Sequence, residues 1–336
     1  MANDGLAPLL QPHIGRRLLF TAGVLVLYRL GCEIPLPGLN TDALAGLNGL
    51  LKTEMVSIFA LGVTPLFSAL FVFEFLKLIV PPLSRWETSD PKRAQRIGFV
   101  IYLVALAAAG VQARGLASAF YGINGLVDGP EWENLIAITL VAGAALIFWL
   151  SERITLHGLG NGFWLVLITP TLINLPAAAA GSLELLRMGA VSQNALTAAC
   201  LFLAVATTLV VVTAVTGRAA TENRISGADF ASVWPPLLAT TIAAFVVPFF
   251  SLQAGGAIHL ILIAVLIAAF TWLQSLGTSR QALRRIWTVA AVQILICAGG
   301  ELLTHQVALP FAINGSWLIV VVTTMMSLLR SKDAAA

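Results

Sequence analysis

Residues 148–176 read FWLSERITLHGLGNGFWLVLITPTLINLP: two apolar segments joined by a short polar elbow. The apolar run before the elbow is long enough to end a membrane-spanning helix, and charge then appears at a membrane boundary. Glycines around an asparagine let the backbone turn sharply where side chains would clash, and the asparagine is placed to cap the next helix. The elbow motif consists of Glu152, Gly158, Gly160, Asn161 and Gly162.

The apolar segment after the elbow contains two prolines, Pro170 and Pro176. Proline removes a backbone donor and clashes with the preceding turn, so this pattern predicts a helix that is short or kinked. A broken helix persists in lipid only where protein or a water-filled path covers the freed backbone groups. The stretch therefore indicates a membrane protein with an irregular interior.

The composition agrees with a membrane protein. Hydrophobic residues make up 58% of the chain and charged residues 10%, whereas a soluble domain carries about 25% charged residues. The net charge of +3 offers no basic face for nucleic acid. The three scattered cysteines and four separated histidines have neither disulfide nor metal-ligand spacing. We therefore expect no nucleic acid, no cofactor and no metal.

Hydropathy predicts an all-α membrane protein with ten transmembrane helices. The predicted spans are 17–32, 57–80, 96–114, 132–151, 160–178, 194–216, 230–250, 256–276, 284–303 and 311–330. An even number of spans places both termini on one side of the membrane.

The distribution of Lys and Arg predicts which side that is. With the N-terminus in the cytoplasm, the outer loops contain only Lys52, Arg114 and Arg187. The cytoplasmic segments then contain Arg16, Arg17, Arg85, Lys92, Arg93, Arg96, Arg153, Arg218, Arg224, Arg280, Arg284, Arg285, Arg330 and Lys332. This bias predicts cytoplasmic N- and C-termini.

Two spans suggest an internal repeat. The second carries Pro65 and the seventh carries Pro235 and Pro236. Matching proline-interrupted helices in two halves point to a central site in inverted-repeat membrane proteins. The expected halves are residues 1–190, with helices one to five, and residues 191–336, with helices six to ten.

Two polar groups permit other interpretations. Glu74 and Lys77 lie inside the second span three residues apart, so they can form an ion pair. They are either functional groups of the membrane interior or residues near its surface, where the lysine reaches toward water. His157 beside the elbow could suggest catalysis, but no nucleophile with a base and an orienting group is recognisable, so we expect no enzyme.

Three motifs in order resemble the SecY family, the pore subunits of the bacterial protein-export channel. The elbow resembles the family's W-L-G-E-x-I-T-x-x-G-I-G-N-G. Residues 18–40, LLFTAGVLVLYRLGCEIPLPGLN, resemble its first helix and the I-P-x-P-G exit, and residues 57–69, SIFALGVTPLFSA, resemble its second core helix. The resemblance is close over residues 16–176 and weakens afterwards.

The resemblance implies two pseudo-symmetric five-helix halves around a pore for unfolded polypeptide in the bacterial inner membrane. It also implies a small SecE-like subunit and a side gate to the lipid bilayer. The family's mid-membrane ring of apolar side chains maps to Val63, Phe67, Leu167, Thr171, Trp234 and Ile319, although ordinary helix packing stays open for Trp234 and Thr171. The gate maps to Leu66, Leu70, Phe73, Glu74, Leu237, Thr240 and Thr241.

The chain departs from the family pattern in three links. The segment 38–56, where the family has a plug helix, is short, and residues 43–51 have room for one or two helical turns. The links 217–229 and 277–285 are also short and carry few basic residues. In the family these links dock ribosomes or the motor SecA, so we expect such docking to be weak or absent.

Two alternatives remain to the protein-conducting channel. One is a specialised SecY paralog with narrowed or lost translocation activity. The other is a small-solute secondary transporter with inverted repeats, which would hold a charged or polar midplane site. Beyond Glu74 the predicted midplane has no such group, which favours the channel.

The topology is directly testable with reporter fusions. Because the Lys and Arg bias places the N-terminus inside, fusions after residues 125 and 190 should report the outer side of the membrane. A fusion after residue 90 should report the cytoplasm. A cytoplasmic signal after residue 125 would contradict the predicted number of spans.

Overall fold

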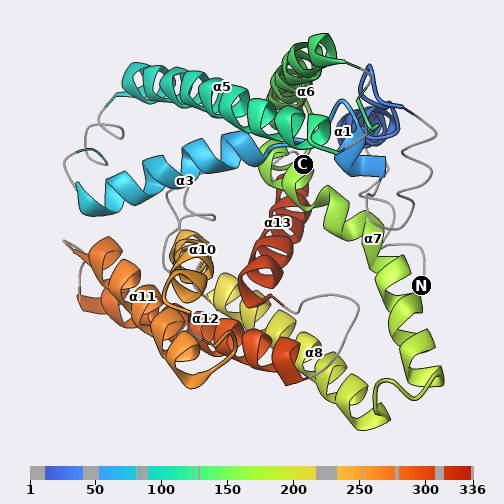
Figure 1. The fold of residues 1–336 in the computed structure, drawn as a ribbon. Coiled ribbons are helices and arrows are strands. Elements are labelled where there is room, and N and C mark those ends of the chain that lie inside the picture. Colours follow the sequence, from blue (N-terminus) through green and yellow to red (C-terminus); the bar gives the residue numbers. More distant parts are fainter. Residues whose placement is uncertain are drawn as a thin grey trace. The chain divides into compact units, whose positions relative to one another are not determined.

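The computed structural model is all-helical over the residues that it describes (Figure 1). These residues are 12–40, 53–80, 83, 90–123, 125–127, 129–216, 233–251, 253–276, 280–306 and 314–333. Each of the ten predicted spans overlaps one α-helix, which confirms the predicted fold class. The elements are α1 (Pro12–Gly31), the 3-10 helix η2 (Thr53–Val56), α3 (Thr64–Ile79), α5 (Pro91–Tyr121), α6 (Pro130–His157), α7 (Gly162–Arg187), α8 (Gln193–Thr216), α10 (Trp234–Phe249), α11 (Ala257–Ser275), α12 (Arg280–Gln306) and α13 (Gly315–Asp333).

Six described helices are long and apolar enough to cross a membrane by themselves: α5, α6, α7, α8, α11 and α12. Helix α10 and residues 315–329 of α13 are apolar but shorter. Helix α3 is also short, because residues 57–63 of the predicted second span form turns before it begins. The suggested plug turns at residues 43–51 lie outside the described residues.

The prolines lie at other places within their helices than the sequence predicted. Pro65, Pro235 and Pro236 lie in the first turns of α3 and α10. They therefore begin these helices and do not interrupt them, because the first turn needs no backbone donor within the helix. The sequence predicts a short or kinked helix after the elbow, and the first of these alternatives is wrong: α7 has 26 residues and continues through Pro170 and Pro176. The kink stays a prediction.

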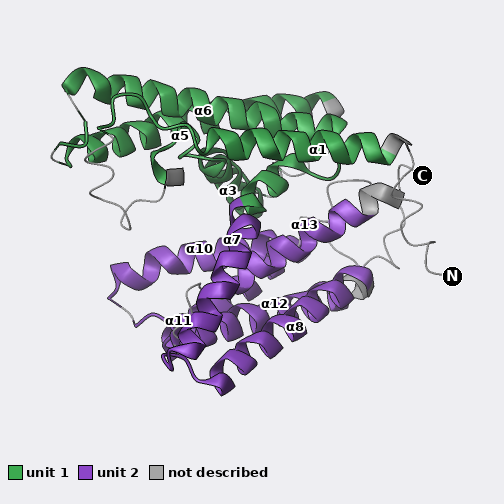
Figure 2. Cartoon of the chain, turned by 90° about the vertical axis from the view of Figure 1, so that its right-hand side faces the viewer, with its two compact units in different colours: residues 1–169, 330–336 green, residues 170–329 purple. Residues whose placement is uncertain are grey.

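The chain forms two compact units (Figure 2). Unit 1 comprises residues 1–169 and 330–336, and unit 2 comprises residues 170–329. Helix α7 begins in unit 1 and ends in unit 2, since the division falls at Pro170. The predicted halves, 1–190 and 191–336, describe an internal repeat, which these units do not test.

In unit 1, α5 packs between α3 and α6, and α6 also packs against α1. One face of α5 carries a fully buried alanine in every turn: Ala105, Ala109, Ala113 and Ala117. Small side chains let helices approach closely, which is how helices pack tightly where lipid offers no hydrophobic driving force.

Polar contacts join α5 to both of its neighbours. At one end of α5, Ser118 Oγ donates a hydrogen bond of 2.6 Å to Glu133 Oε1 of α6, and Arg114 Nε lies 3.7 Å from the same carboxylate oxygen. Further along, Gln112 Nε2 donates to Ser68 Oγ of α3 at 3.4 Å. The interhelical bonds therefore reinforce the packing of alanines.

The segment after α1 is held by backbone hydrogen bonds. Leu36 N donates to Val56 O at 2.9 Å, and Ile58 N donates to Ile34 O at 3.0 Å. Asn40 N donates to Leu126 O at 2.9 Å. The I-P-x-P-G exit motif therefore lies between η2 and the α5–α6 connection. We call the hydrogen-bonded segments 34–40 and 56–58 the clasp, and α3 begins shortly after it.

In unit 2, α11 packs against α10 and α12, and α12 also packs against α8. Gly315, the first residue of α13, lies against the backbone of Ile296 and Cys297 in α12. A ring of α8, Phe202, lies against Gly299 of α12. Glycines thus set the closest helix approaches in this unit too.

The close approach at Gly143 is testable. A Cβ atom on Gly143 of α6 would overlap the carbonyl oxygen of Ile58, so Gly143→Ala should separate α6 from the clasp and destabilise the protein by about 1–3 kcal/mol. Gly110→Ala in α5 is the matched control, because no heavy atom lies within 4 Å of the added methyl group. The control should be neutral or stabilising by up to about 1 kcal/mol. Thermal unfolding in detergent measures both, and equal losses would contradict the packing argument.

Candidate functional site

The elbow between α6 and α7 is closed by a helix cap. Asn161 Oδ1 accepts hydrogen bonds from Phe163 N at 3.1 Å and Trp164 N at 3.5 Å. These amides belong to the first turn of α7, which has no earlier helical partner for them. Asn161 therefore caps α7, as the sequence predicted.

The Thr155 hydroxyl also joins the end of α6 to the start of α7. Thr155 Oγ1 accepts from Gly162 N at 2.9 Å and donates to Ser151 O at 3.0 Å. The start of α7 is so close to the end of α6 that a Cβ atom on Gly162 would overlap the Ser151 carbonyl oxygen. Glycine at position 162 is thus required by contact with a backbone atom that cannot move aside.

The other two elbow glycines serve different purposes. Gly160 has a φ of +73°, in the left-handed region that favours glycine. Gly158 has an ordinary negative φ of −98°, but an added Cβ atom would lie 2.5 Å from Thr21 Oγ1. The predicted motif therefore combines one turn residue with two close contacts.

Thr21 of α1 anchors the elbow from a distant part of the sequence. Leu159 N donates a hydrogen bond of 2.9 Å to Thr21 Oγ1, and that hydroxyl donates to Arg17 O at 3.0 Å. Both Leu159 and Thr21 are buried. Sequence reasoning missed Thr21, because a lone threonine in an apolar helix has no local pattern that marks its partner.

The charged elbow residues do not form a catalytic arrangement. The His157 ring lies 5.9 Å from the Phe20 ring, and the Arg153 guanidinium lies 5.2 Å from the ring centre of Trp149. Glu152 is exposed. These contacts position aromatic and cationic groups at a helix end, an arrangement typical of membrane boundaries.

The residues predicted for the pore ring are divided between the two units. In unit 1, Val63 is buried immediately before α3, and Phe67 N donates to Val63 O at 2.9 Å. The Phe67 ring is half-buried, 6.1 Å from the ring of Phe71. Leu167 is half-buried in α7, among neighbours from Phe163 to Thr169 that are otherwise all buried.

In unit 2, Trp234 is the buried first residue of α10, and Ile319 is buried in α13. Thr171 of α7 is exposed. Because three members belong to each unit, the ring as a whole stays a prediction. What the structure gives directly is that Val63 and Phe67 share one end of α3.

The predicted gate residues lie on α3 and α10. Leu66 and Leu237 are buried, whereas Leu70, Phe73, Glu74, Thr240 and Thr241 are half-buried. Lys77 Nζ lies 2.6 Å from Glu74 Oε1 and 5.1 Å from the ring centre of Phe73. The predicted ion pair is confirmed, so the Glu74 carboxylate is matched by a cation on its own helix.

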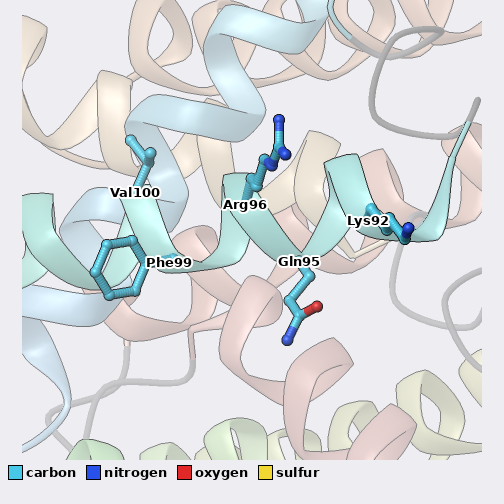
Figure 3. A pocket seen from close by; sticks show the side chains of 5 residues that line it. All are labelled: Lys92, Gln95, Arg96, Phe99 and Val100. Atoms are coloured by element: carbon cyan, nitrogen blue, oxygen red, sulfur yellow. The ribbon is translucent and has the colours of Figure 1, made fainter.

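An open hollow of about 710 Å³ adjoins the start of α5. Figure 3 shows five side chains of α5 that line it: Lys92, Gln95, Arg96, Phe99 and Val100. Arg96 and Gln95 point in opposite directions in this view (Figure 3). Among these described side chains the polar groups do not converge as they do in a substrate site.

Comparison with known proteins identifies one family. A model of the SecY family matches residues 57–282. The protein translocase subunit SecY of Thermus thermophilus is 32% identical over 202 residues, covering 54% of this chain and 46% of the relative. That of Streptococcus gordonii is 28% identical over 188 residues, covering 51% and 43% respectively. The chain thus spans somewhat less than half the length of these curated relatives.

Solved structures support the fold. A structure described by the role of the SecY plug domain in the closed translocation channel has a TM-score of 0.61 at 16% identity, covering 97% of this chain and 94% of the other. Sec61 in the canine ribosome-channel complex has a TM-score of 0.62 at 15% identity, with the same coverage. At such low identity the likeness concerns the fold alone.

The anchor at Thr21 is testable by removing one hydroxyl. Thr21→Val leaves the buried Leu159 amide without its acceptor, which should destabilise the protein by about 1–3 kcal/mol. Thr139→Val is the matched control, because within the described residues that exposed hydroxyl bonds only Leu135 O of its own helix. This control should change stability by less than about 0.5 kcal/mol. Thermal unfolding with amide exchange at Leu159 measures the effect. An unchanged exchange rate in Thr21→Val would show that the bond does not hold the elbow.

Proposed function

Because its residues 57–282 match the family model, this chain belongs to the SecY family, and we propose that it forms a channel that conducts unfolded polypeptide across the bacterial inner membrane or sideways into it. The family match carries the proposal, together with the two short helices α3 and α10. Such a channel performs no covalent chemistry. It needs a wet path, a narrow apolar seal and an opening to lipid.

The lengths of α3 and α10 support an interrupted membrane crossing. Each has 16 residues, about 24 Å at a rise of about 1.5 Å per residue, whereas the hydrocarbon core is about 30 Å thick. Each helix therefore begins or ends inside the bilayer. Pro65, Pro235 and Pro236 in the first turns remove amides that would otherwise lie unsatisfied there.

In this proposal the ring of predicted residues forms the seal. Val63 and Phe67 lie at the start of α3, where the helix meets the membrane interior. Apolar side chains around a narrow waist exclude water, and a dewetted waist blocks ions without any hydrogen-bonded plug. The proposed gate helices are α3 and α10, which carry the predicted gate residues.

The partners follow from the family and from the loops. We propose a small SecE-like membrane subunit and cytoplasmic N- and C-termini, as the Lys and Arg bias indicates. Binding to ribosomal RNA relies on clustered cations, and the link 217–229 offers only Arg218 and Arg224, offset by Glu222 and Asp229. We therefore expect weak docking of ribosomes and of SecA, with an apolar client or a dedicated partner supplying the driving force.

The two alternatives differ from the channel in measurable ways. A paralog with lost activity keeps the fold but has no open path. A secondary transporter needs a charged or polar site for its substrate at mid-membrane. Glu74, the residue that best fits such a site, is already paired with Lys77 at 2.6 Å, which favours the channel.

Ion conductance tests the seal. In Val63→Ala combined with Phe67→Ala, two apolar side chains of the waist are truncated, so the waist should admit water and the conductance of reconstituted bilayers should rise above the wild-type value. Val72→Ala combined with Leu76→Ala is the matched control, because both side chains are exposed on the same helix, at 53% and 43%. That control should conduct like the wild type.

Two results would reject the proposal. Background conductance in the Val63 and Phe67 variant, at normal folding and insertion, would place the waist elsewhere or indicate a closed bundle. A transporter or an inactive paralog gives this result as well. Equal leaks in both double variants would instead show general loosening of α3.

A further inference from the structure

Helix α10 has a covered and an uncovered face in its second half. Ala243 and Val247 are buried, whereas Phe245 is 76% exposed and Ala244 is exposed too. Successive residues of a helix turn by about 100°. Ala243 and Phe245 are two residues apart and therefore point about 160° away from each other. A rotation of α10 by about two residues would exchange these faces, so contacts within unit 2 must fix the rotation.

Thr240 makes the interhelical bond that can do this. Its hydroxyl donates to Ser316 Oγ of α13 at 3.0 Å, and Ser316 Oγ donates to Asn314 Oδ1 at 2.7 Å. Asn314 Oδ1 also accepts from Ser316 N at 3.1 Å. Ser316 is only 2% exposed. A partly buried series of hydrogen bonds therefore runs from the middle of α10 to the cap of α13.

The number of hydroxyl protons decides which group donates in each of these hydrogen bonds. Each hydroxyl has a single proton. The proton of Ser316 is used on Asn314, so Thr240 must be the donor between the two hydroxyls. Thr240 Oγ1 also lies 2.9 Å from Pro236 O and 3.3 Å from Leu237 O, and a carbonyl oxygen with two lone pairs can accept both a backbone amide and a hydroxyl. The single Thr240 proton is therefore shared between its own helix and Ser316 Oγ of α13, which lies 3.0 Å away.

Ser316 is a fixed reference point. The preceding residue, Gly315, lies against the carbonyl of Ile296 and the Cα atom of Cys297 in α12. Because a backbone contact of this kind leaves no space for movement, the first turn of α13 is attached to α12. A bond to Ser316 therefore ties α10 to two helices.

The neighbouring threonine shows the contrast. The hydroxyl of Thr241 donates at 2.7 Å to Leu237 O of its own helix. It makes no other hydrogen bond within the described part of the chain. Two adjacent threonines of one helix thus differ in a single respect, the bond to α13.

We propose that Thr240 is a positioning residue: its bond to Ser316 fixes the rotation of α10 and so selects the face that the gate helix leaves uncovered. That face carries Thr241, Ala244 and Phe245. The inference rests on the proposed function, in which α10 is a gate helix. It assigns Thr240 and Thr241, both predicted as gate residues, to different roles, since Thr240 holds the helix and Thr241 lies on the face offered to lipid or to a passing polypeptide.

Thiol labelling of the protein without a translocating polypeptide tests the rotation of α10. Single cysteines at Ala243 and Phe245 are introduced after Cys32, Cys200 and Cys297 are replaced by alanine. With Thr240 intact, the cysteine at 245 should react rapidly with a membrane-permeant maleimide and that at 243 slowly. In Thr240→Val the ratio of the two rates should fall by about 3-fold to 20-fold, the equilibrium equivalent of an interhelical hydrogen bond in a membrane.

Three controls make the result specific. Thr241→Val, the matched control, should leave the labelling ratio unchanged, and Thr240→Ser should restore it. Ser316→Ala should lower the ratio as Thr240→Val does, with no further loss in the double variant, because both remove the same bond. Equal effects of Thr240→Val and Thr241→Val, additive effects of Thr240→Val and Ser316→Ala, or an unchanged ratio in Thr240→Val would each overturn the proposal. Labelling needs no conducting channel, so its outcome is independent of the conductance test.

Discussion

A backbone amide or carbonyl without a partner costs several kcal/mol inside a membrane, and much of the irregular structure removes such groups. At the elbow, Thr21, Thr155 and Asn161 provide side-chain acceptors for amides that α6 and α7 cannot satisfy. At the exit motif, extended backbone segments do the same through hydrogen bonds to each other. Prolines in the first turns of α3 and α10 eliminate the donors altogether.

The same constraint explains what could be predicted from the sequence. Apolar length predicted ten helices, and the cap at Asn161 and the pair of Glu74 with Lys77 followed from local spacing. Local spacing gave the wrong prediction for the prolines, which were expected to interrupt two helices. Pro65 and Pro235 are compatible with an interrupted helix or with a helix start, and only the turns at residues 57–63 decide for the start in α3.

Long-range partners could not be predicted. Thr21 bonds Leu159, 138 residues away, and Thr240 bonds Ser316, 76 residues away. Nothing in the sequence near Thr240 distinguishes it from Thr241, because both are threonines in an apolar helix. Their difference arises from the position of α13. Which residues form the waist depends in the same way on tertiary arrangement, so the pore ring stays a prediction built on motif resemblance.

The 16-residue length of α3 and α10 also concerns the surrounding lipid. A hydrophobic helix about 6 Å shorter than the hydrocarbon core leaves a mismatch, and the bilayer must thin locally or admit water at the helix end, at a cost of a fraction of a kcal/mol per ångström. Longer acyl chains increase that cost and shorter ones relieve it. The thickness of the host membrane is therefore a physical variable that acts on these two helices, and lipid composition can tune the protein without binding to any site.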